Sequence, residues 1–207
     1  MSCSLCGSLA CDSFFATNRH FFRCGDCGLV FVNSAEHISP LQELERYNHH
    51  NNSLQNQGYE KYLRHCFEVF ASNWQRGESL LDFGSGKDGP LGKIAAALGF
   101  SCTSYDLFYQ NDPMLLAKSF DGIFCLETCE HFRDPWQEFS LLHSMLKPGG
   151  AIAIRTEFLP LDFANWFYHR DPTHICFYSE ATFSWLAKSL GFEILLCHAP
   201  FVLLKKI

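Results

Sequence analysis

Apolar and polar positions follow two periodicities from residue 59 onward. Apolar residues at three- and four-residue spacing predict amphipathic helices, whereas short apolar runs bounded by glycine or acidic residues predict buried strands. The predicted helices cover residues 59–76, 90–98, 134–146 and 179–190, and the predicted strands cover residues 80–83, 100–105, 120–126, 151–155, 192–197 and 201–206. Strands that alternate with helices in this way are typical of a doubly wound α/β sheet.

The helix predicted over residues 59–76 carries a stripe of aromatic and apolar residues from Tyr59 to Trp74. A stripe at helical spacing is more often a packing surface than a cofactor site, so we predict that it lies in the core. A shorter helix is predicted over residues 41–47. The polar segment 49–53 after it is interpreted as a solvated loop or lid, with metal ligation by its histidines as the alternative.

A glycine-rich turn follows the strand predicted over residues 80–83. Gly84, Gly86 and Gly89 satisfy the G-x-G-x-x-G fingerprint of dinucleotide sites, and Asp106 follows at the separation of about 20 residues that this fingerprint expects. Glycines let a ligand approach the backbone, and the next helix offers free N–H groups to an anion. The structural alternative is a turn that only closes a βα unit.

The acid two residues before the first glycine separates the cofactor classes. Asp82-x-Gly84-x-Gly86 resembles motif I of class I S-adenosylmethionine (SAM) methyltransferases. The resemblance implies that Asp82 and the glycines hold the methionine end of SAM, and that Asp106 accepts hydrogen bonds from the ribose hydroxyls. The cofactor-binding residues expected on this basis are Asp82, Gly84, Ser85, Gly86, Asp106, Leu107, Leu126 and Glu127.

The third βα unit of this fold is expected to be shortened. Residues 107–118 are too few for a full helix and a strand, so Asn111 or Asp112 is expected to replace the usual contacts to the adenine. The same resemblance implies that the fold ends in an antiparallel pair of strands, at residues 192–197 and 201–206.

The second half of the chain extends the resemblance. Residues 121–131 read D-x-I-x-x-L-E-x-x-E-H, a helix follows, and residues 146–150 read L-K-P-G-G before the next strand. This order resembles the second half of a class I methyltransferase core. Residues 166–178 resemble an insertion that places aspartate, histidine and aromatic residues over the active site in small-molecule members of that family.

The E-x-x-E-H motif supplies the expected catalytic residues. If the segment is helical, Glu127, Glu130 and His131 share one face, and the arrangement resembles the acceptor site of quinone-biosynthesis methyltransferases. We expect His131 to act as the general base, with His174 of the insertion as orienter or alternative base and Glu130 as a further catalytic residue. In one alternative Glu127, Glu130 and His131 bind a divalent cation. In the other, His131 only caps a helix and Glu130 is solvated.

The first 32 residues have the cysteine spacing of a zinc ribbon. Cys3-x-x-Cys6 and Cys24-x-x-Cys27 are separated by seventeen residues, which matches a tetrathiolate site. Four thiolates complete a tetrahedral shell, so the expected zinc is structural. Short strands are expected at residues 14–15, 20–23 and 29–32 between and after the pairs. The alternative is four unlinked core cysteines.

Composition limits the partners and the compartment. The formal net charge is −6, and Arg19 and Arg23 balance Asp12 and Asp26 in the ribbon, so a nucleic-acid partner is not expected. No apolar run approaches the roughly 20 residues that span a bilayer, and no secretory signal is visible. Eleven cysteines without export favour a reducing, cytoplasmic location. The ribbon is interpreted as a dock for a protein partner or as a module that shapes the substrate site.

The sequence therefore predicts three parts: a zinc ribbon at residues 1–32, a polar linker or lid at 33–57, and a SAM-dependent methyltransferase domain at 58–207. The expected reaction is methyl transfer to an oxygen, nitrogen or carbon atom of a small molecule. The alternatives are an RNA or protein methyltransferase that recognises its substrate through the ribbon, a non-catalytic SAM-binding scaffold, and an NAD-dependent oxidoreductase, for which the chain is too short.

Overall fold

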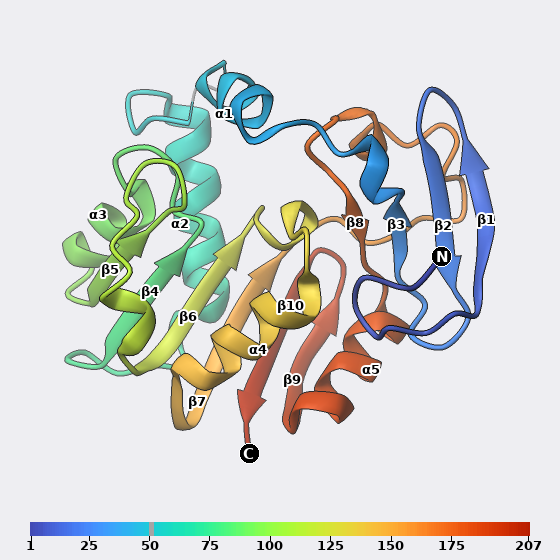
Figure 1. Cartoon of the computed structure of the whole chain (residues 1–207). Coiled ribbons are helices and arrows are strands. Elements are labelled where there is room, and N and C mark those ends of the chain that lie inside the picture. The colour runs from blue at the N-terminus through green and yellow to red at the C-terminus, as the bar shows by residue number, and fades with distance from the viewer. Residues whose placement is uncertain (50–51) are drawn as a thin grey trace.

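The computed structural model describes residues 1–49 and 52–207, which form a larger sheet covered by helices and a smaller sheet beside it (Figure 1). The predicted loop 49–53 therefore lies partly outside the described residues. In those two ranges, none of the helices combines the length and the apolar character that crossing a bilayer requires.

The larger sheet has six strands in the order β5-β4-β6-β7-β10-β9. Their bounds are β4 Ser79–Phe83, β5 Ser101–Tyr105, β6 Phe120–Leu126, β7 Leu146–Arg155, β9 Phe192–His198 and β10 Phe201–Lys206. The first four strands are parallel, and β10 is antiparallel to both β7 and β9. The predicted doubly wound sheet with a final antiparallel pair is confirmed. Strand β7 begins earlier than expected because Leu146 already pairs with Phe120.

The shortened third βα unit is also confirmed. Between β5 and β6, the described residues form only the short 3-10 helix η2 (Leu115–Ala117), and β5 is an edge strand. Asn111 and Asp112, which were expected on the adenine side of the cofactor, are exposed in this connection.

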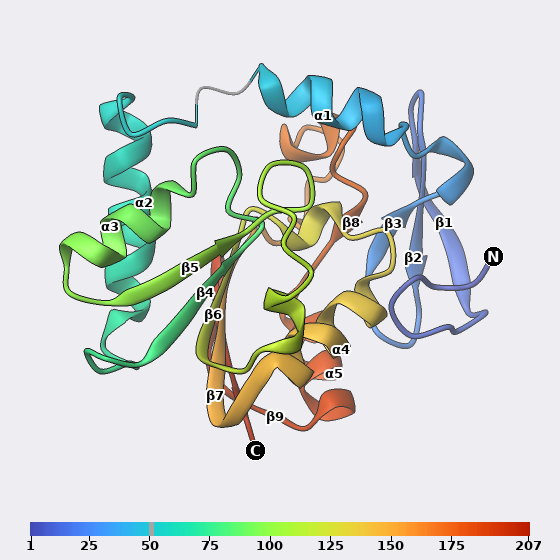
Figure 2. The same cartoon turned by 60° about the vertical axis from the view of Figure 1, so that its left-hand side comes forward.

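Helices cover both faces of the larger sheet. Helices α2 (Gln57–Ala71) and α3 (Pro90–Ala97) pack on one face, and α4 (Pro135–Met145) and α5 (Glu180–Leu190) pack on the other (Figure 2). Neighbouring strand residues point to opposite faces of the sheet. Leu80 therefore belongs to the apolar cluster with α2 and α3, and Leu81 belongs to the cluster with α4 and α5. Ser179 caps α5 and Gly191 ends it in a left-handed conformation.

The smaller sheet contains more than the first 32 residues. Its strands are β1 (Cys11–Ala16), β2 (His20–Cys24), β3 (Val30–Val32) and β8 (Cys176–Phe177), in that order. The predicted short strands of the ribbon are therefore present. Strand β8 was not predicted, and it brings part of the insertion into the same sheet because β3 pairs with it.

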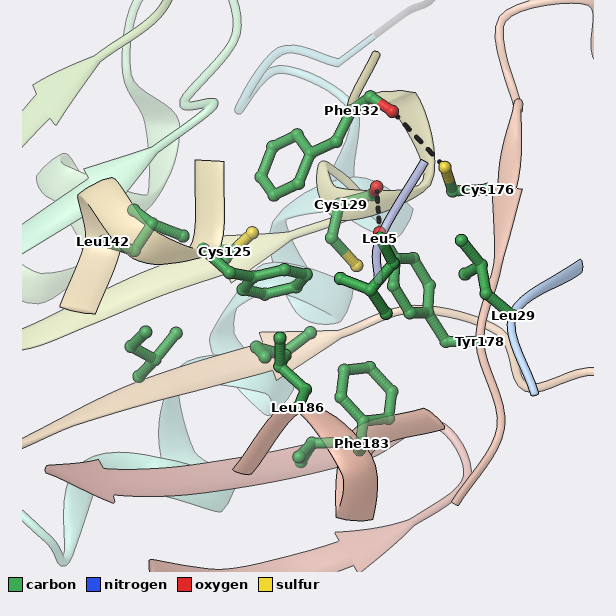
Figure 3. Close-up of a cluster of buried hydrophobic side chains, with 14 of the residues drawn as sticks. Leu5, Leu29, Cys125, Cys129, Phe132, Leu142, Cys176, Tyr178, Phe183 and Leu186 are labelled. Carbon is green, nitrogen blue, oxygen red and sulfur yellow. Dashed lines mark hydrogen bonds between the residues drawn. The ribbon is translucent and has the colours of Figure 1, made fainter. Parts of the chain in front are cut away.

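A single apolar cluster joins the two sheets. Leu5 and Leu29 of the ribbon segment lie beside Tyr178 and Phe183, which belong to the larger part of the protein (Figure 3). The Tyr178 hydroxyl donates to the backbone carbonyl of Cys129 at 2.9 Å. The ribbon segment and the segment that follows β6 thus share one apolar cluster, which contains Leu5, Leu29 and Cys129.

Helix α1 (Pro40–Asn48) crosses the top of the molecule, between the smaller sheet and α2 (Figures 1 and 2). Ser39 caps it through a capping box with Gln42, so the predicted short helix is confirmed. Two arginine–carboxylate pairs hold α1 in place: Arg133 with Glu43 at 3.0 Å and Arg46 with Asp171 at 2.8 Å. The helix therefore covers the carboxyl ends of the central strands.

Candidate active site

A cavity of 1110 Å³ lies beneath α1, at the carboxyl ends of β4, β5 and β6. Its walls come from α1, the start of α2, the glycine turn, the segments after β5 and β6, and the insertion. Ligands of open α/β sheets bind at this edge, where strand carboxyl ends meet. Of the residues expected to bind the cofactor, those that line the cavity are Gly84, Ser85, Gly86, Asp106, Leu107, Leu126 and Glu127.

The turn after β4 is closed by backbone contacts to β5. The N–H groups of Gly84 and Ser85 donate to the Tyr105 carbonyl at 2.9 and 3.0 Å. Gly84 has φ +80°, and a Cβ there would lie 2.3 Å from the Thr128 side chain. Gly86 has φ +66°, and a Cβ there would meet nothing within 4 Å. Gly84 is therefore required because a side chain there would clash with Thr128, and Gly86 is required by its backbone conformation. The missing side chain at Gly86 leaves the cavity open at that point.

The two acids of the resembled motif lie at different depths. Asp106 lines the cavity; its Oδ2 accepts from the Gly86 N–H at 2.9 Å, and its Oδ1 accepts from the Phe108 N–H at 2.8 Å. Asp82 is 4% exposed and lies outside the cavity wall. Burial, and then the charge of Asp106, raises the pKa of Asp82 to about 7. Asp82 was expected to help hold the methionine end of SAM, but in this structure its side chain is buried and does not line the cavity.

Glu127 is held by three side chains at the cavity wall. Its carboxylate pairs with Arg155 and accepts from the hydroxyls of Tyr62 at 2.8 Å and Tyr168 at 2.9 Å. Its φ is +49°, a left-handed conformation that is costly for a residue with a side chain. Such strain persists only where the surroundings fix it, and here the three contacts do so.

Glu130 is fully buried behind that wall. Its carboxyl group accepts from Thr156 Oγ1 at 3.1 Å and contacts the Tyr168 hydroxyl closely. Burial raises the pKa of Glu130 to about 7. The Tyr168 hydroxyl contacts both Glu127 and Glu130 but has only one proton to donate. Both contacts are satisfied when Tyr168 donates to Glu127 and a protonated Glu130 donates to the Tyr168 oxygen. The alternative with a solvated Glu130 is therefore wrong.

The E-x-x-E-H segment is helical only over Cys129–His131, as the 3-10 helix η3. Glu127 precedes this turn, so the predicted common helical face of Glu127, Glu130 and His131 does not form. The two carboxyl groups meet instead through Tyr168.

His131 and His174 line the cavity side by side, with ring centroids 4.9 Å apart. Each Nδ1 faces a backbone carbonyl, that of Thr173 for His131 at 2.9 Å and that of Tyr168 for His174 at 2.8 Å. A carbonyl only accepts, so Nδ1 carries the hydrogen in each ring and Nε2 keeps a lone pair. Burial lowers the pKa of both rings, and the neighbouring His131 lowers that of His174 further, to about 3. Both imidazoles are therefore neutral at pH 7.

The residues that lie together around the His131 and His174 rings are not the same three that were expected to bind a cation. Ligand atoms of Glu130, His131 and His174 lie within 4.8 Å of one another. Glu127 was expected in this group, but its carboxylate is paired with Arg155.

The four predicted zinc ligands also converge. The sulfur atoms of Cys3 and Cys27 are 3.5 Å apart, those of Cys6 and Cys24 are 3.4 Å apart, and all four lie within 4.8 Å of one another. A tetrahedron with Zn–S bonds of about 2.3 Å has edges of roughly 3.8 Å. The four sulfurs therefore fit a zinc ion with small adjustments.

Several residues of the cavity were missed from the sequence. The aromatic stripe on α2 was predicted to lie in the core, which holds for Phe67 and Phe70 but not for Tyr62, which lines the cavity. Tyr168 was recognised only as part of the aromatic insertion. The available signal was the hydroxyl group itself, since a buried tyrosine usually needs a hydrogen-bond partner.

Comparisons with known proteins agree with this geometry. A family model described as a methyltransferase domain matches residues 47–196. No curated protein sequence matched the chain. Solved structures do match, and three of them show the extent of the similarity.

A SAM-dependent methyltransferase from Archaeoglobus fulgidus is 20% identical, with a TM-score of 0.53 over 65% of this chain and 69% of that chain. A 1,6-didemethyltoxoflavin-N1-methyltransferase from Burkholderia thailandensis is 13% identical, with a TM-score of 0.58 over 93% and 97%. An O-methyltransferase of neocarzinostatin biosynthesis is 14% identical, with a TM-score of 0.51 over 81% and 60%. At these identities the structures show the shared fold, whereas the family model covers more than half of the sequence. The chain therefore belongs to the methyltransferase domain family and is an enzyme that transfers methyl groups.

Proposed function

We propose that this enzyme transfers a methyl group from SAM to an oxygen, nitrogen or carbon atom of a small molecule. The observation that carries the proposal is the continuity of the cavity. One wall has the glycine turn and Asp106, and another has His131 and His174. A cofactor and an acceptor in the same cavity can lie in contact with water excluded, which is most of what methyl transfer requires from a protein.

The first wall suits SAM. Bound there, SAM would supply a methyl group on a sulfonium centre with a good leaving group. Asp106 presents a carboxylate to the cavity for the ribose hydroxyls, and the missing Cβ at Gly86 leaves room for close approach. Glu127 and Arg155 line the same cavity as an ion pair and can contact the methionine end, whereas Asp82 is buried two residues before the turn.

The second wall suits removal of a proton from the acceptor. His131 is neutral at pH 7 and its Nε2 keeps a lone pair, so it can accept the proton that the attacking atom releases. His174 orients the acceptor or replaces His131 as base. Glu130 supports this wall through Tyr168 and does not line the cavity itself.

The cover that α1 provides over part of the cavity favours a small acceptor. Helix α1 covers it and is tied to the insertion by Arg46 and Asp171. Two solved structures with the same fold contain small molecules: the toxoflavin N-methyltransferase holds 1,6-didemethyltoxoflavin, and the O-methyltransferase holds 2-hydroxy-5-methyl naphthoic acid. These similarities support a small acceptor for this enzyme too.

The remaining parts have supporting roles in this proposal. Residues 1–32 bind a structural zinc ion through Cys3, Cys6, Cys24 and Cys27. Residues 33–57 form the linker and lid, and residues 58–207 form the methyltransferase domain.

Asp106→Asn is expected to weaken binding of S-adenosylhomocysteine by about tenfold or more, since a charged hydrogen bond contributes about 1.5–3 kcal/mol. Asparagine has one acceptor oxygen and can serve either the Gly86 N–H or the Phe108 N–H, so the melting temperature of the variant is measured alongside its affinity. Calorimetric titration measures the affinity, and Asp12→Asn is the matched control because Asp12 is exposed and lies outside the cavity wall. Binding of NAD in preference to S-adenosylhomocysteine would contradict the cofactor assignment.

The acceptor class is tested by incubating the enzyme with labelled SAM and a fractionated small-molecule extract. Mass spectrometry should find labelled products of low molecular mass, and Asp106→Asn should form fewer of them. Label that appears only in RNA or protein, from an unfractionated extract, would contradict the small-molecule assignment.

A further inference from the structure

Arg19 of the ribbon segment is bound to the segment of the insertion that carries His174. It lies between β1 and β2, is only 8% exposed, and donates to four backbone carbonyls of residues 169–174. Nη1 donates to Pro172 at 3.2 Å and His174 at 3.0 Å, and Nη2 donates to Asp171 at 3.0 Å and also to His169. About 150 residues of sequence separate the arginine from these carbonyls.

The four carbonyls need a cation of this shape. Their negative ends point toward one place in a part of the structure that is largely shielded from water, an arrangement that is unfavourable without a positive group. A guanidinium group has five donors in one plane and can bridge several carbonyls at once, whereas an ammonium group cannot reach all four. Arg19 therefore fixes the backbone conformation of residues 169–174.

That backbone in turn orients both imidazole rings of the active site. His131 Nδ1 donates to the Thr173 carbonyl, which lies between two carbonyls bound by Arg19. His174 lies in the same segment, and its Nδ1 donates to the Tyr168 carbonyl at the start of it. Moving the segment would turn both rings away from their present directions.

We propose that Arg19 is a positioning residue for methyl transfer, which makes the ribbon part of the active-site scaffold. The inference rests on the proposed roles of His131 and His174. Arg19 does not line the cavity and acts through the carbonyls that fix the two rings. Pairing of β3 with β8 holds the other end of the segment, where the Val32 N–H donates to the Ile175 carbonyl at 2.9 Å.

The test is the position of the His174 ring in the zinc-loaded full chain, read by proton NMR. The Tyr168 ring lies 4.0 Å from the His174 ring, so its ring current shifts the His174 Hε1 resonance. In Arg19→Ala we expect this resonance to move toward the value of an exposed histidine, while zinc content and affinity for S-adenosylhomocysteine stay unchanged. Guanidinium chloride at low concentration should restore the resonance, and methylammonium chloride should not.

Arg23→Ala is the matched control. Arg23 lies on the same hairpin and is exposed, and its guanidinium group lies over the Phe14 ring instead of binding the carbonyls of residues 169–174. If Arg19→Ala does not fold, Arg19→Lys replaces it, because lysine keeps the charge but cannot bridge four carbonyls. An unshifted His174 resonance in the variant used would overturn the proposal, as would a shift that occurs equally in Arg23→Ala or only with loss of zinc. The resonance is read without acceptor or cofactor, so failure of the proposed reaction would be seen separately in the product assay.

Discussion

His131→Ala is expected to lower the turnover of the enzyme by about 10²-fold or more, the range for loss of a general base. Its affinity for S-adenosylhomocysteine should stay nearly unchanged, because His131 is not among the residues expected to bind the cofactor. The physical reason is the fixed tautomer: the Thr173 carbonyl holds the hydrogen on Nδ1, and burial keeps the ring neutral. Alanine leaves no group at that position that can accept a proton.

The measurement is single-turnover methyl transfer to the acceptor found in the extract experiment. His65→Ala is a suitable control, since His65 is exposed on α2 and does not line the cavity. Turnover within a few-fold of the parent enzyme would remove His131 from the mechanism and assign its role to His174.

The same assay separates the base from a bound cation. Under the proposed mechanism, a chelator that leaves the structural zinc in place should not change the rate. A loss of activity that Mg²⁺ restores would instead support a cation at Glu130, His131 and His174, the group that the structure brings together.

The architecture of the larger sheet could be predicted because its signals are local. The strand, turn and helix around Asp82 are encoded by an apolar run, by glycines and by a proline at the first helical position. The shortened third βα unit follows from chain length alone, since residues 107–118 cannot form a helix and a strand. Such features need no knowledge of distant contacts.

The features that the sequence did not reveal depend on contacts between distant residues. Strand β8 has only two residues, and its pairing with β3 joins positions about 145 residues apart. Tyr62 belongs to a regular helical stripe, and only its position above the sheet edge separates it from the core residues Phe67 and Phe70. A periodic pattern identifies one face of a helix but not where that face passes from core to cavity.

In the candidate site, too, some features follow from local sequence and others depend on contacts between distant residues. The sequence indicated which polar residues end the strands, and most of them do line one cavity. It did not indicate that Glu127 and Glu130 meet through Tyr168, because their arrangement was considered only for the case that the segment is helical. A left-handed residue at Glu127 breaks that helix, and no local pattern marks it.

Cys24→Ser is expected to remove zinc from the protein and to unfold the first 32 residues. Structural zinc sites contribute about 10–16 kcal/mol of apparent binding free energy, far more than the packing of a segment of this size can replace. The purified parent protein should contain one zinc ion per chain, and metal analysis of both proteins checks this. Cys11→Ser is the matched control, because Cys11 lies outside the four-cysteine group and should leave the zinc in place.

Unfolding of the ribbon should reach the active site, because the smaller sheet contains β8 of the insertion. In Cys24→Ser, hydrogen exchange should therefore speed up at Val32, whose N–H donates to the Ile175 carbonyl, and at Ile175, whose N–H donates to the Glu130 carbonyl. The amides of β4 and β6 should keep their protection, since they belong to the larger sheet. Parent protein that holds no zinc after purification under reducing conditions would contradict the ribbon assignment, and unchanged exchange at Ile175 in a zinc-free variant would separate the ribbon from the active site.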